Sequence, residues 1–252
     1  FDAFDMVKIL PSFNAEGPDY VGTDEVIRIR GLNVTHAGNT EIEGVPMPNG
    51  PAAGASVSIF DPDNIESIDT YLGAVPPEQG FNVFGDFPGI LDIHLLKPSN
   101  TFGAKIKEYF GTHDLTDTFF RVDSGNLDNR FKFFISGSYL YSHKWKGPGQ
   151  IKRSNITFDG ELKVGDALFI NLLTGYTKNK HNNYFQYTFS QLNQYGYDYD
   201  YNTNPRSALY YNYNLEDVSY FYFLPAFNIK PDNNQRIVFK PYWWTIKGYN
   251  EY

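Results

Sequence analysis

Cysteine is absent from this sequence of 252 residues, which excludes a disulfide scaffold, a thiolate metal site and a cysteine nucleophile. Long apolar runs are also absent. No stretch approaches the roughly 18 apolar residues of a membrane-spanning helix, so such a helix is not expected. Positive charge is scarce, with 21 Lys and Arg against 29 Asp and Glu. The formal net charge of −8 argues against a nucleic-acid partner, because nucleic acid requires a basic face.

The common catalytic motifs are missing as well. The five histidines, at positions 36, 94, 113, 143 and 181, show no metal-ligand spacing, and no G-x-S-x-G elbow surrounds a serine. Asp61, Asp63 and Asn64 resemble part of a calcium loop but lack its glycine and its terminal glutamate, so a turn cap is expected there. We therefore expect no enzyme, no bound metal ion and no cofactor.

Aromatic residues are the abundant class. Twenty Tyr, 22 Phe and 3 Trp make 18% of the chain, although its mean hydropathy is −0.44. A soluble domain normally builds its core from aliphatic side chains. Many aromatics in a chain that is polar on average are typical of a membrane β-barrel, whose strands alternate between apolar and polar faces.

Alternation of this kind begins after about residue 100. In 155–164, Ile156, Phe158, Gly160, Leu162 and Val164 lie on one face and charged or polar residues lie on the other, which indicates a strand with water on one side. Gly165-Asp166 predicts a tight hairpin to the next strand. Seven strands are expected in all, at 101–110, 118–122, 131–141, 155–164, 168–176, 220–230 and 236–247. A soluble β-sandwich alternates in the same way and is the alternative.

Five short segments of the first hundred residues occur in a characteristic order. They are 26–31 (V-I-R-I-R-G), 42–46 (I-E-G-V-P), 61–69 (D-P-D-N-I-E-S-I-D), 73–80 (G-A-V-P-P-E-Q-G) and 89–98 (G-I-L-D-I-H-L-L-K-P). In this order and spacing the set resembles the plug domain of TonB-dependent outer-membrane receptors, in the manner of siderophore receptors. The alternating strands begin where the barrel of such a receptor would begin.

The resemblance implies a mostly β fold, with an N-terminal α+β plug domain inside a transmembrane antiparallel β-barrel. The family's barrel has about 22 strands, of which about seven are expected here. Residues 1–100 correspond to most of the plug and 101–252 to the first part of the barrel. A partial chain is expected, because seven strands alone would leave open edges in lipid. The box gripped by the energy-transducing partner is expected to lie outside these residues.

The resemblance also implies charged contacts between plug and barrel. One of the family's two plug arginines is replaced, since the corresponding segment reads Leu72-Gly73-Ala74, and Arg30 is then the expected remaining member. Glu43, Glu66 and Glu161 are further candidates for plug–barrel contacts.

The segment 181–214 is expected to be a long extracellular loop, since it is too long for a periplasmic turn. Tyr and Asn dominate it, and these residues suit adaptable recognition surfaces. Some of its tyrosines could instead belong to the aromatic girdle that meets lipid headgroups. Plug loops at 33–40, 47–54 and 75–86 are further candidates. The candidate ligand contacts are Tyr184, Tyr187, Tyr195, Tyr197, Tyr199, Tyr201, Asn49 and Gln79.

The resemblance implies a receptor in the outer membrane of a Gram-negative bacterium, with outer-membrane lipid around it. Its expected work is the energy-dependent uptake of a scarce ligand, gated by the plug and driven by a TonB-type partner. A ferric-siderophore-type chelate is the expected cargo. Cobalamin or an oligosaccharide remains open as cargo, and a soluble β-rich carbohydrate-binding module is the alternative from another class.

Overall fold

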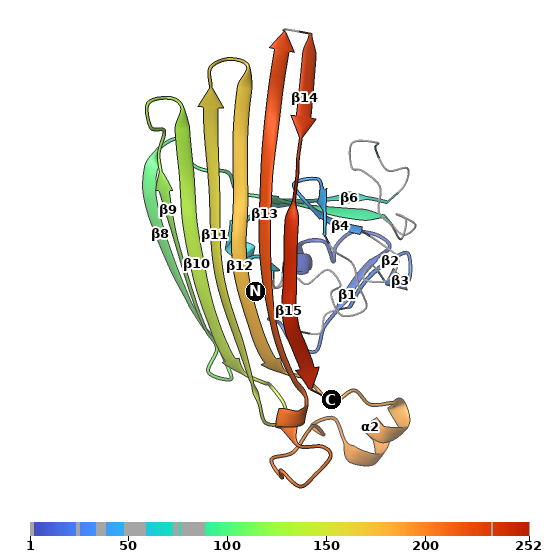
Figure 1. The fold of residues 1–252 in the computed structure, drawn as a ribbon. Helices are drawn as coiled ribbons and strands as arrows, with labels where there is room; N and C mark the ends of the chain where they lie inside the picture. Colours follow the sequence, from blue (N-terminus) through green and yellow to red (C-terminus); the bar gives the residue numbers. More distant parts are fainter. Residues whose placement is uncertain are drawn as a thin grey trace.

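The computed structural model describes residues 3–23, 26–33, 39–47, 59–72, 76, 89–232 and 234–251. Strands dominate it, and they fall into a small N-terminal part and one large sheet (Figure 1). The N-terminal elements are η1 (Ala3–Met6), β1 (Phe13–Glu16), β2 (Val26–Ile29), β3 (Leu32–Asn33), β4 (Asn39–Ile42), β5 (Val45–Pro46), η3 (Pro62–Asn64), β6 (Ile65–Tyr71) and β7 (Ile90–Leu95). The large sheet and its loops hold β8 (Phe102–Phe110), β9 (Thr116–Ser124), β10 (Phe131–His143), β11 (Gln150–Val164), β12 (Leu168–Asn182), α2 (Phe189–Tyr195), η5 (Tyr211–Tyr213), β13 (Leu215–Asp232), β14 (Gln235–Phe239) and β15 (Trp243–Glu251).

The large sheet is an antiparallel meander in which β8 to β14 pair in chain order. Alternation assigns its faces as the sequence predicted. On β11, Thr157 and Asp159 are buried on the inner side, whereas Ile156 and Leu162 are exposed on the outer side. On β11 the outer side therefore carries apolar positions and the inner side polar ones, whereas β12 and β13 also place Leu173 and Tyr222 on the inner side.

The strands are longer than predicted. β11 begins at Gln150 rather than at residue 155, and β12 runs to Asn182, so the long loop is 183–214 rather than 181–214. His181 is a strand residue opposite Ile151. The hairpin after β11 has three linking residues rather than two, and Gly165 supplies its left-handed conformation, with φ of +62°.

The predicted strand 236–247 is divided in two. β14 and β15 both pair with β13, one on each side of Lys240, Pro241 and Tyr242. Pro241 has no N–H to donate to the ladder, which is the physical reason for a break at this point. The large sheet therefore has seven strand positions, the last of them interrupted.

The N-terminal part contains two small sheets, with strand orders β1-β2-β3 and β5-β4-β7-β6. Two-residue turns with positive φ, Arg30-Gly31 and Glu43-Gly44, close the β2–β3 and β4–β5 hairpins. Such φ values are those of a type I′ turn, which matches the twist of the flanking strands. The helical elements of the described residues here are the short η1 and η3.

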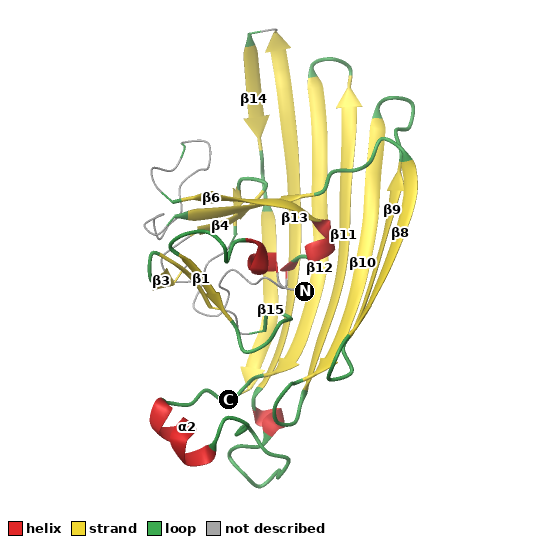
Figure 2. Cartoon of the chain, turned by 180° about the vertical axis from the view of Figure 1, so that it is seen from behind, coloured by secondary structure: helices red, strands yellow, loops and turns green. Residues whose placement is uncertain are grey.

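The N-terminal part packs against the inner side of the large sheet, about midway along its strands (Figures 1 and 2). One apolar cluster joins the two. Ile27, Ile42 and Phe60 of the N-terminal part, which we call the plug from here on, share it with Leu173 and Tyr222 of the sheet. Burial of this apolar surface holds the plug in place, at roughly 25 cal/mol for each Å² removed from water.

Candidate functional site

The loop between β12 and β13 is folded onto itself at one end of the large sheet (Figure 1). Its helix α2 starts at a capping box, in which the Thr188 side chain accepts from the Gln191 N–H and the Gln191 side chain accepts from the Thr188 N–H. The helix ends at Gly196, with φ of +86°. This helix was not predicted, because its signal is the cap and not an apolar periodicity.

A buried ion pair attaches this loop to the turn between β10 and β11. Lys144 Nζ lies 2.7 Å from Asp200 Oδ2, and both side chains are fully buried. Lys144 also donates to the carbonyl of Asn183 at 2.8 Å and lies 4.5 Å from the centroid of the Tyr184 ring. Asp200 accepts from the backbone N–H of Phe185 at 2.8 Å. Partners on both charges offset the cost of burying them.

The same loops touch the plug. Trp145 Nε1 donates to the carbonyl of Pro18 at 2.6 Å, and the Trp145 and Tyr184 rings stack at 6.2 Å. Tyr20 donates to the carbonyl of Thr112 in the β8–β9 turn at 3.2 Å. Burial raises the pKa of Tyr184, and the nearby charge of Asp19 acts in the same direction. The plug segment 18–20 is thus tied to three loops of the large sheet.

A cavity of about 310 Å³ lies between plug and long loop, lined by Glu16, Gly17, Pro18, Val26, Arg28, Tyr184 and Gln186. Its charged groups, Glu16 of β1 and Arg28 of β2, form an exposed ion pair of 3.2 Å. A guanidinium, a carboxylate, a phenol and an amide facing one space can hydrogen-bond to a polar ligand of either charge.

Lys146 and Tyr187 continue this polar and aromatic surface. Lys146 Nζ donates to the Tyr187 hydroxyl at 3.2 Å and lies 4.5 Å from its ring centroid. Tyr197 is 66% exposed, and its ring lies 5.5 Å from that of Trp145. The cation lies over aromatic faces, which is a favourable arrangement.

The predicted ligand tyrosines are all in or beside this loop, but they differ in accessibility. Tyr184 is buried at the cavity, Tyr195 stacks on Tyr199 at 4.6 Å, and the Tyr201 ring packs edge-on against Phe185. The plug candidates Asn49 and Gln79 lie outside the described residues, as do most of the predicted plug loops. Sequence reasoning missed Arg28, Trp145 and Lys146. The run Lys144-Trp145-Lys146 directly after a strand was the available signal.

The plug is fastened to the sheet by the segment 59–64. The carbonyl of Ile59 accepts from Asn155 Nδ2 at 3.1 Å and from Thr177 Oγ1 at 2.7 Å. Asn64 Nδ2 donates to Ser136 Oγ at 2.8 Å. These contacts bring β10, β11 and β12 together under one plug segment.

Asp61 and Asp63 act differently within this segment. Asp61 caps η3 by accepting from the N–H of Asp63 at 2.8 Å, so the predicted turn cap is confirmed. Burial raises the pKa of Asp61. Asp63 pairs with Lys107 of β8 and accepts from the Tyr109 hydroxyl at 3.2 Å, and Lys105 lies 3.9 Å away. One plug carboxylate therefore meets two lysines of the sheet.

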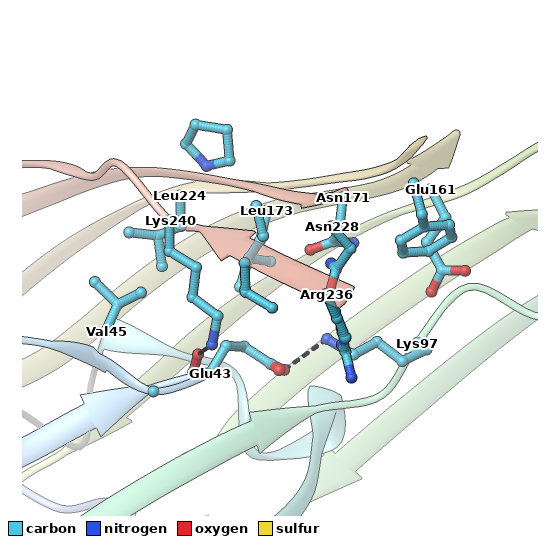
Figure 3. Close-up of a pocket in the computed structure, with 15 residues that line it drawn as sticks. Glu43, Val45, Lys97, Glu161, Asn171, Leu173, Leu224, Asn228, Arg236 and Lys240 are labelled. Atoms are coloured by element: carbon cyan, nitrogen blue, oxygen red, sulfur yellow. Dashed lines mark hydrogen bonds and ion pairs between the residues drawn. The ribbon is translucent and has the colours of Figure 1, made fainter. Parts of the chain in front are cut away.

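A second cavity, of about 730 Å³, lies between the β4–β5 hairpin and the sheet (Figure 3). Glu43 is at its plug side. Lys97 lies 2.7 Å from Glu43 Oε1, and Lys240 donates to the Glu43 carbonyl. Burial opposes ionisation of Glu43, but hydrogen bonding from His94 and the charge of Lys97 outweigh it and lower the pKa to about 2. The hydrogen bond to Glu43 raises the pKa of His94 to about 9.

The four predicted plug–barrel residues are placed as follows. Glu43 and Glu161 line the second cavity from opposite sides, and Glu161 pairs within the sheet with Lys132 at 3.1 Å. Arg30 and Glu66 are exposed, and the described residues provide neither with a side-chain partner. Their contact with the barrel stays a prediction. The ionic contacts present have both polarities. Asp63 of the plug meets Lys105 and Lys107 of β8, whereas Lys97, which follows β7, lies 4.0 Å from Asp159 of β11.

Among the described residues, no helix is long and apolar enough to cross a membrane. No group of His, Asp and Glu within the described ranges is arranged to hold a metal ion.

Comparisons with known proteins give a result at the level of structure alone. No protein-family model and no curated protein matches the sequence. The fold is similar to that of the ferric-catecholate import receptor Fiu from E. coli K12, with a TM-score of 0.71 and 14% identity over 98% of this chain and 36% of that chain.

Two further receptors match over the same share of this chain. The ferric citrate transporter FecA in its unliganded form has a TM-score of 0.73 and 15% identity, with 38% of its chain covered. The siderophore receptor PiuA from Acinetobacter baumannii has a TM-score of 0.69 and 11% identity, with 34% covered. This chain thus spans little more than a third of their length. It has the fold of the plug and first barrel strands of TonB-dependent outer-membrane receptors, as the ordered plug segments predicted.

Proposed function

We propose that this chain is the plug and early barrel of an outer-membrane receptor that takes up a scarce ferric chelate, gated by the plug and driven by a TonB-type partner. The observation that carries the proposal is the seat of the plug on the inner face of the sheet. A plug held there by apolar packing and by polar contacts at 59–64 closes the barrel interior to free diffusion. A ligand can then enter only if the plug moves, so uptake requires energy.

The ferric chelate is proposed as cargo from two supports. The similar structures include receptors whose names specify ferric catecholate and ferric citrate. The loop-side cavity offers Arg28, and the β10–β11 turn, whose Trp145 stacks on the cavity residue Tyr184, offers Lys146. Two cations suit a negatively charged chelate. The aromatic rings of Tyr184, Tyr187 and Tyr197 supply rigid contact area around them.

A soluble carbohydrate-binding module is disfavoured by the outer face of the sheet. Phe102, Ile106 and Phe110 on β8 are each more than three quarters exposed. Large apolar side chains in register on an open face are costly in water and suit a lipid boundary.

The test is uptake by cells that carry the full native protein as their single candidate receptor. Radiolabelled iron would be offered as ferric catecholate, ferric hydroxamate and ferric citrate, with labelled cobalamin and maltodextrin as the alternative cargoes. We expect uptake of one ferric chelate that stops when the proton motive force is collapsed. Uptake of cobalamin or maltodextrin instead would show that the cargo is not a ferric chelate. Uptake that persists after the proton motive force is collapsed would contradict energy-dependent gating by the plug.

Point variants locate the ligand site. Arg28→Gln and Lys146→Gln should each raise the half-saturating chelate concentration about tenfold, since a charge-assisted hydrogen bond contributes about 1.5–3 kcal/mol. Lys163→Gln, at the far end of β11, is the matched control. Equal chelate affinity in all three variants would show that the chelate does not bind in this cavity.

A further inference from the structure

The outer face of the sheet carries an unusual group of cations near its loop end. Lys152 on β11, Lys178 and Lys180 on β12 and Lys247 on β15 all occupy outward positions of the alternation. Their sequence neighbours Arg153, Thr177 and Asn179 are buried on the inner side. We call these four residues the lysine patch.

The register brings the members of the patch together. Lys152 stands directly opposite Lys180, and Lys178 and Lys247 are both opposite Ser219 of β13. Like charges directly across a ladder repel and destabilise the pair. An arrangement that places two lysines face to face calls for an anion.

The chain supplies only part of the negative charge that these lysines require. Asp217 Oδ1 lies 3.3 Å from Lys178 Nζ, and its Oδ2 lies 3.4 Å from Lys180 Nζ. Lys152 Nζ instead lies 5.6 Å from the Tyr141 ring centroid. Lys178 and Lys180 thus share one carboxylate, and the described residues place no carboxylate within ion-pair distance of Lys152 or Lys247. The formal net charge of the chain is −8, so the positive surplus is local.

The position of the patch along the strands indicates the partner. Next to it, one row away, lie Ile156, Tyr176 and Phe221, all exposed on the outer face. The apolar positions of β11 run from Ile156 to Val164, about 27 Å at roughly 3.4 Å per residue. Since strands of such barrels tilt by roughly 35–45°, that length spans about 20 Å of height, close to the apolar band of about 25 Å on outer-membrane barrels. The patch therefore lies just past the band, on the side of the long loop.

We propose that the lysine patch binds the phosphorylated headgroups of outer-leaflet lipid. The inference relies on the proposed function for one point, that the long loop faces outside. Ammonium groups at the headgroup level attract anionic lipid, and lysine serves phosphate as a point charge. Tyr141 and Tyr249 border the patch on either side and suit the same interfacial level.

The test compares lipid retained by the full native protein after purification in non-ionic detergent. Purified diphosphoryl lipid A would be titrated into the wild type and into Lys152→Gln/Lys178→Gln/Lys180→Gln, with binding read by native mass spectrometry. Lys163→Gln/Lys230→Gln, near the other end of β11 and β13, removes two cations as a control. Dephosphorylated lipid A and inorganic phosphate are the comparison ligands.

We expect the triple variant to bind diphosphoryl lipid A at least tenfold more weakly than wild type and control, and added salt to weaken wild-type binding. Equal binding by the triple variant, or equal affinity of the wild type for dephosphorylated lipid A, would overturn the proposal. So would inorganic phosphate that displaces lipid A at millimolar concentration, because the site would then serve free phosphate. Chelate uptake measured on the same proteins separates the two proposals. Normal wild-type uptake together with unchanged lipid binding by the triple variant sinks only this proposal. Absence of uptake by the wild type, with phosphate-dependent lipid binding intact, sinks only the transport proposal.

Discussion

Lys144 and Asp200 form the ion pair whose loss should disturb the loop region most. With both side chains fully buried at 2.7 Å, removal of either leaves a charge in a dry site. Asp200→Ala should destabilise the folded loop by about 3–5 kcal/mol. The measurement is limited proteolysis within 183–214, which should become many times faster.

Asp198→Ala is the matched control, since Asp198 is an exposed acid two residues away in the same loop. Replacing both members of the pair by apolar residues should recover much of the protection. If Asp200→Ala and Asp198→Ala are cut at the same rate, the pair does not hold the loop.

His94 should make plug stability depend on pH. Its contacts are Glu43 at 3.6 Å and Asp69 and Asp92 at 3.4 Å each. They raise its pKa from 6.5 to about 9, so the folded state binds the proton more tightly than the unfolded chain does. The stabilisation is complete below pH 6.5 and is lost as the pH rises through 9.

Thermal unfolding in detergent at pH 6, 7, 8 and 10 tests this dependence. Wild type should lose about 1–2 kcal/mol across the range, allowing for solvent screening of a partly exposed group. The His94→Gln variant should lose less stability than the wild type over this range. The gap between the two losses should grow between pH 6.5 and 9. Parallel curves would show that His94 is not the titrating group.

At the scale of elements, β12 and β13 meet through a glycine. A Cβ added at Gly175 would collide with the hydroxyl of Tyr222, a fully buried side chain that packs edge-on against Phe60 of the plug at 5.6 Å. Gly175→Ala should therefore push Tyr222 out of place and cost about 1–3 kcal/mol.

Gly103→Ala on β8 is the control, because a Cβ there meets nothing within 4 Å. Denaturant unfolding in detergent should show a lower midpoint for Gly175→Ala and a change within about 0.5 kcal/mol for Gly103→Ala. Two equal midpoints would mean that Tyr222 repacks without strain.

Period-two alternation predicted the faces of the strands because it depends on local geometry alone. The alternation could not predict where the strands end. Residues 150–154 continue β11 because they pair with β12 up to His181, and that pairing is not written in 150–154 themselves. Tyr184 was predicted as a ligand contact from composition, but its burial follows from Lys144 and Asp200, which lie far from it in the sequence.

At the scale of the whole molecule, one plug carboxylate forms ion pairs with the first barrel strand. Asp63 meets Lys107, Lys105 and Tyr109, all on β8. Asp63→Asn should loosen the plug, and hydrogen exchange of 59–71 in the full native protein should become about tenfold faster. A tenfold change corresponds to about 1.4 kcal/mol.

Asp128→Asn is the control for that variant, since Asp128 is an exposed acid in the turn between β9 and β10. Exchange in 59–71 should stay at the wild-type rate there. If both variants exchange alike, the Asp63 contact does not hold the plug, which is then seated by apolar packing and the hydrogen bonds of Ile59 and Asn64.

The order of strands in the plug sets how it yields to a mechanical load. β1 and β2 are antiparallel, with Phe13 opposite Ile29, so a pull on the chain ahead of Phe13 loads both strands at the same end and peels them apart one bond at a time. β4 and β7 are parallel, with Asn39 opposite Ile90 and the chain leaving β7 at Leu95 towards the barrel. A pull arriving at Asn39 loads that ladder at opposite ends, in shear, where its bonds resist together. The two sheets of the plug should therefore differ in mechanical resistance. The sheet of β1 and β2 should open at a small force and the sheet of β4 and β7 at a larger one, so force spectroscopy would show two separate extension steps.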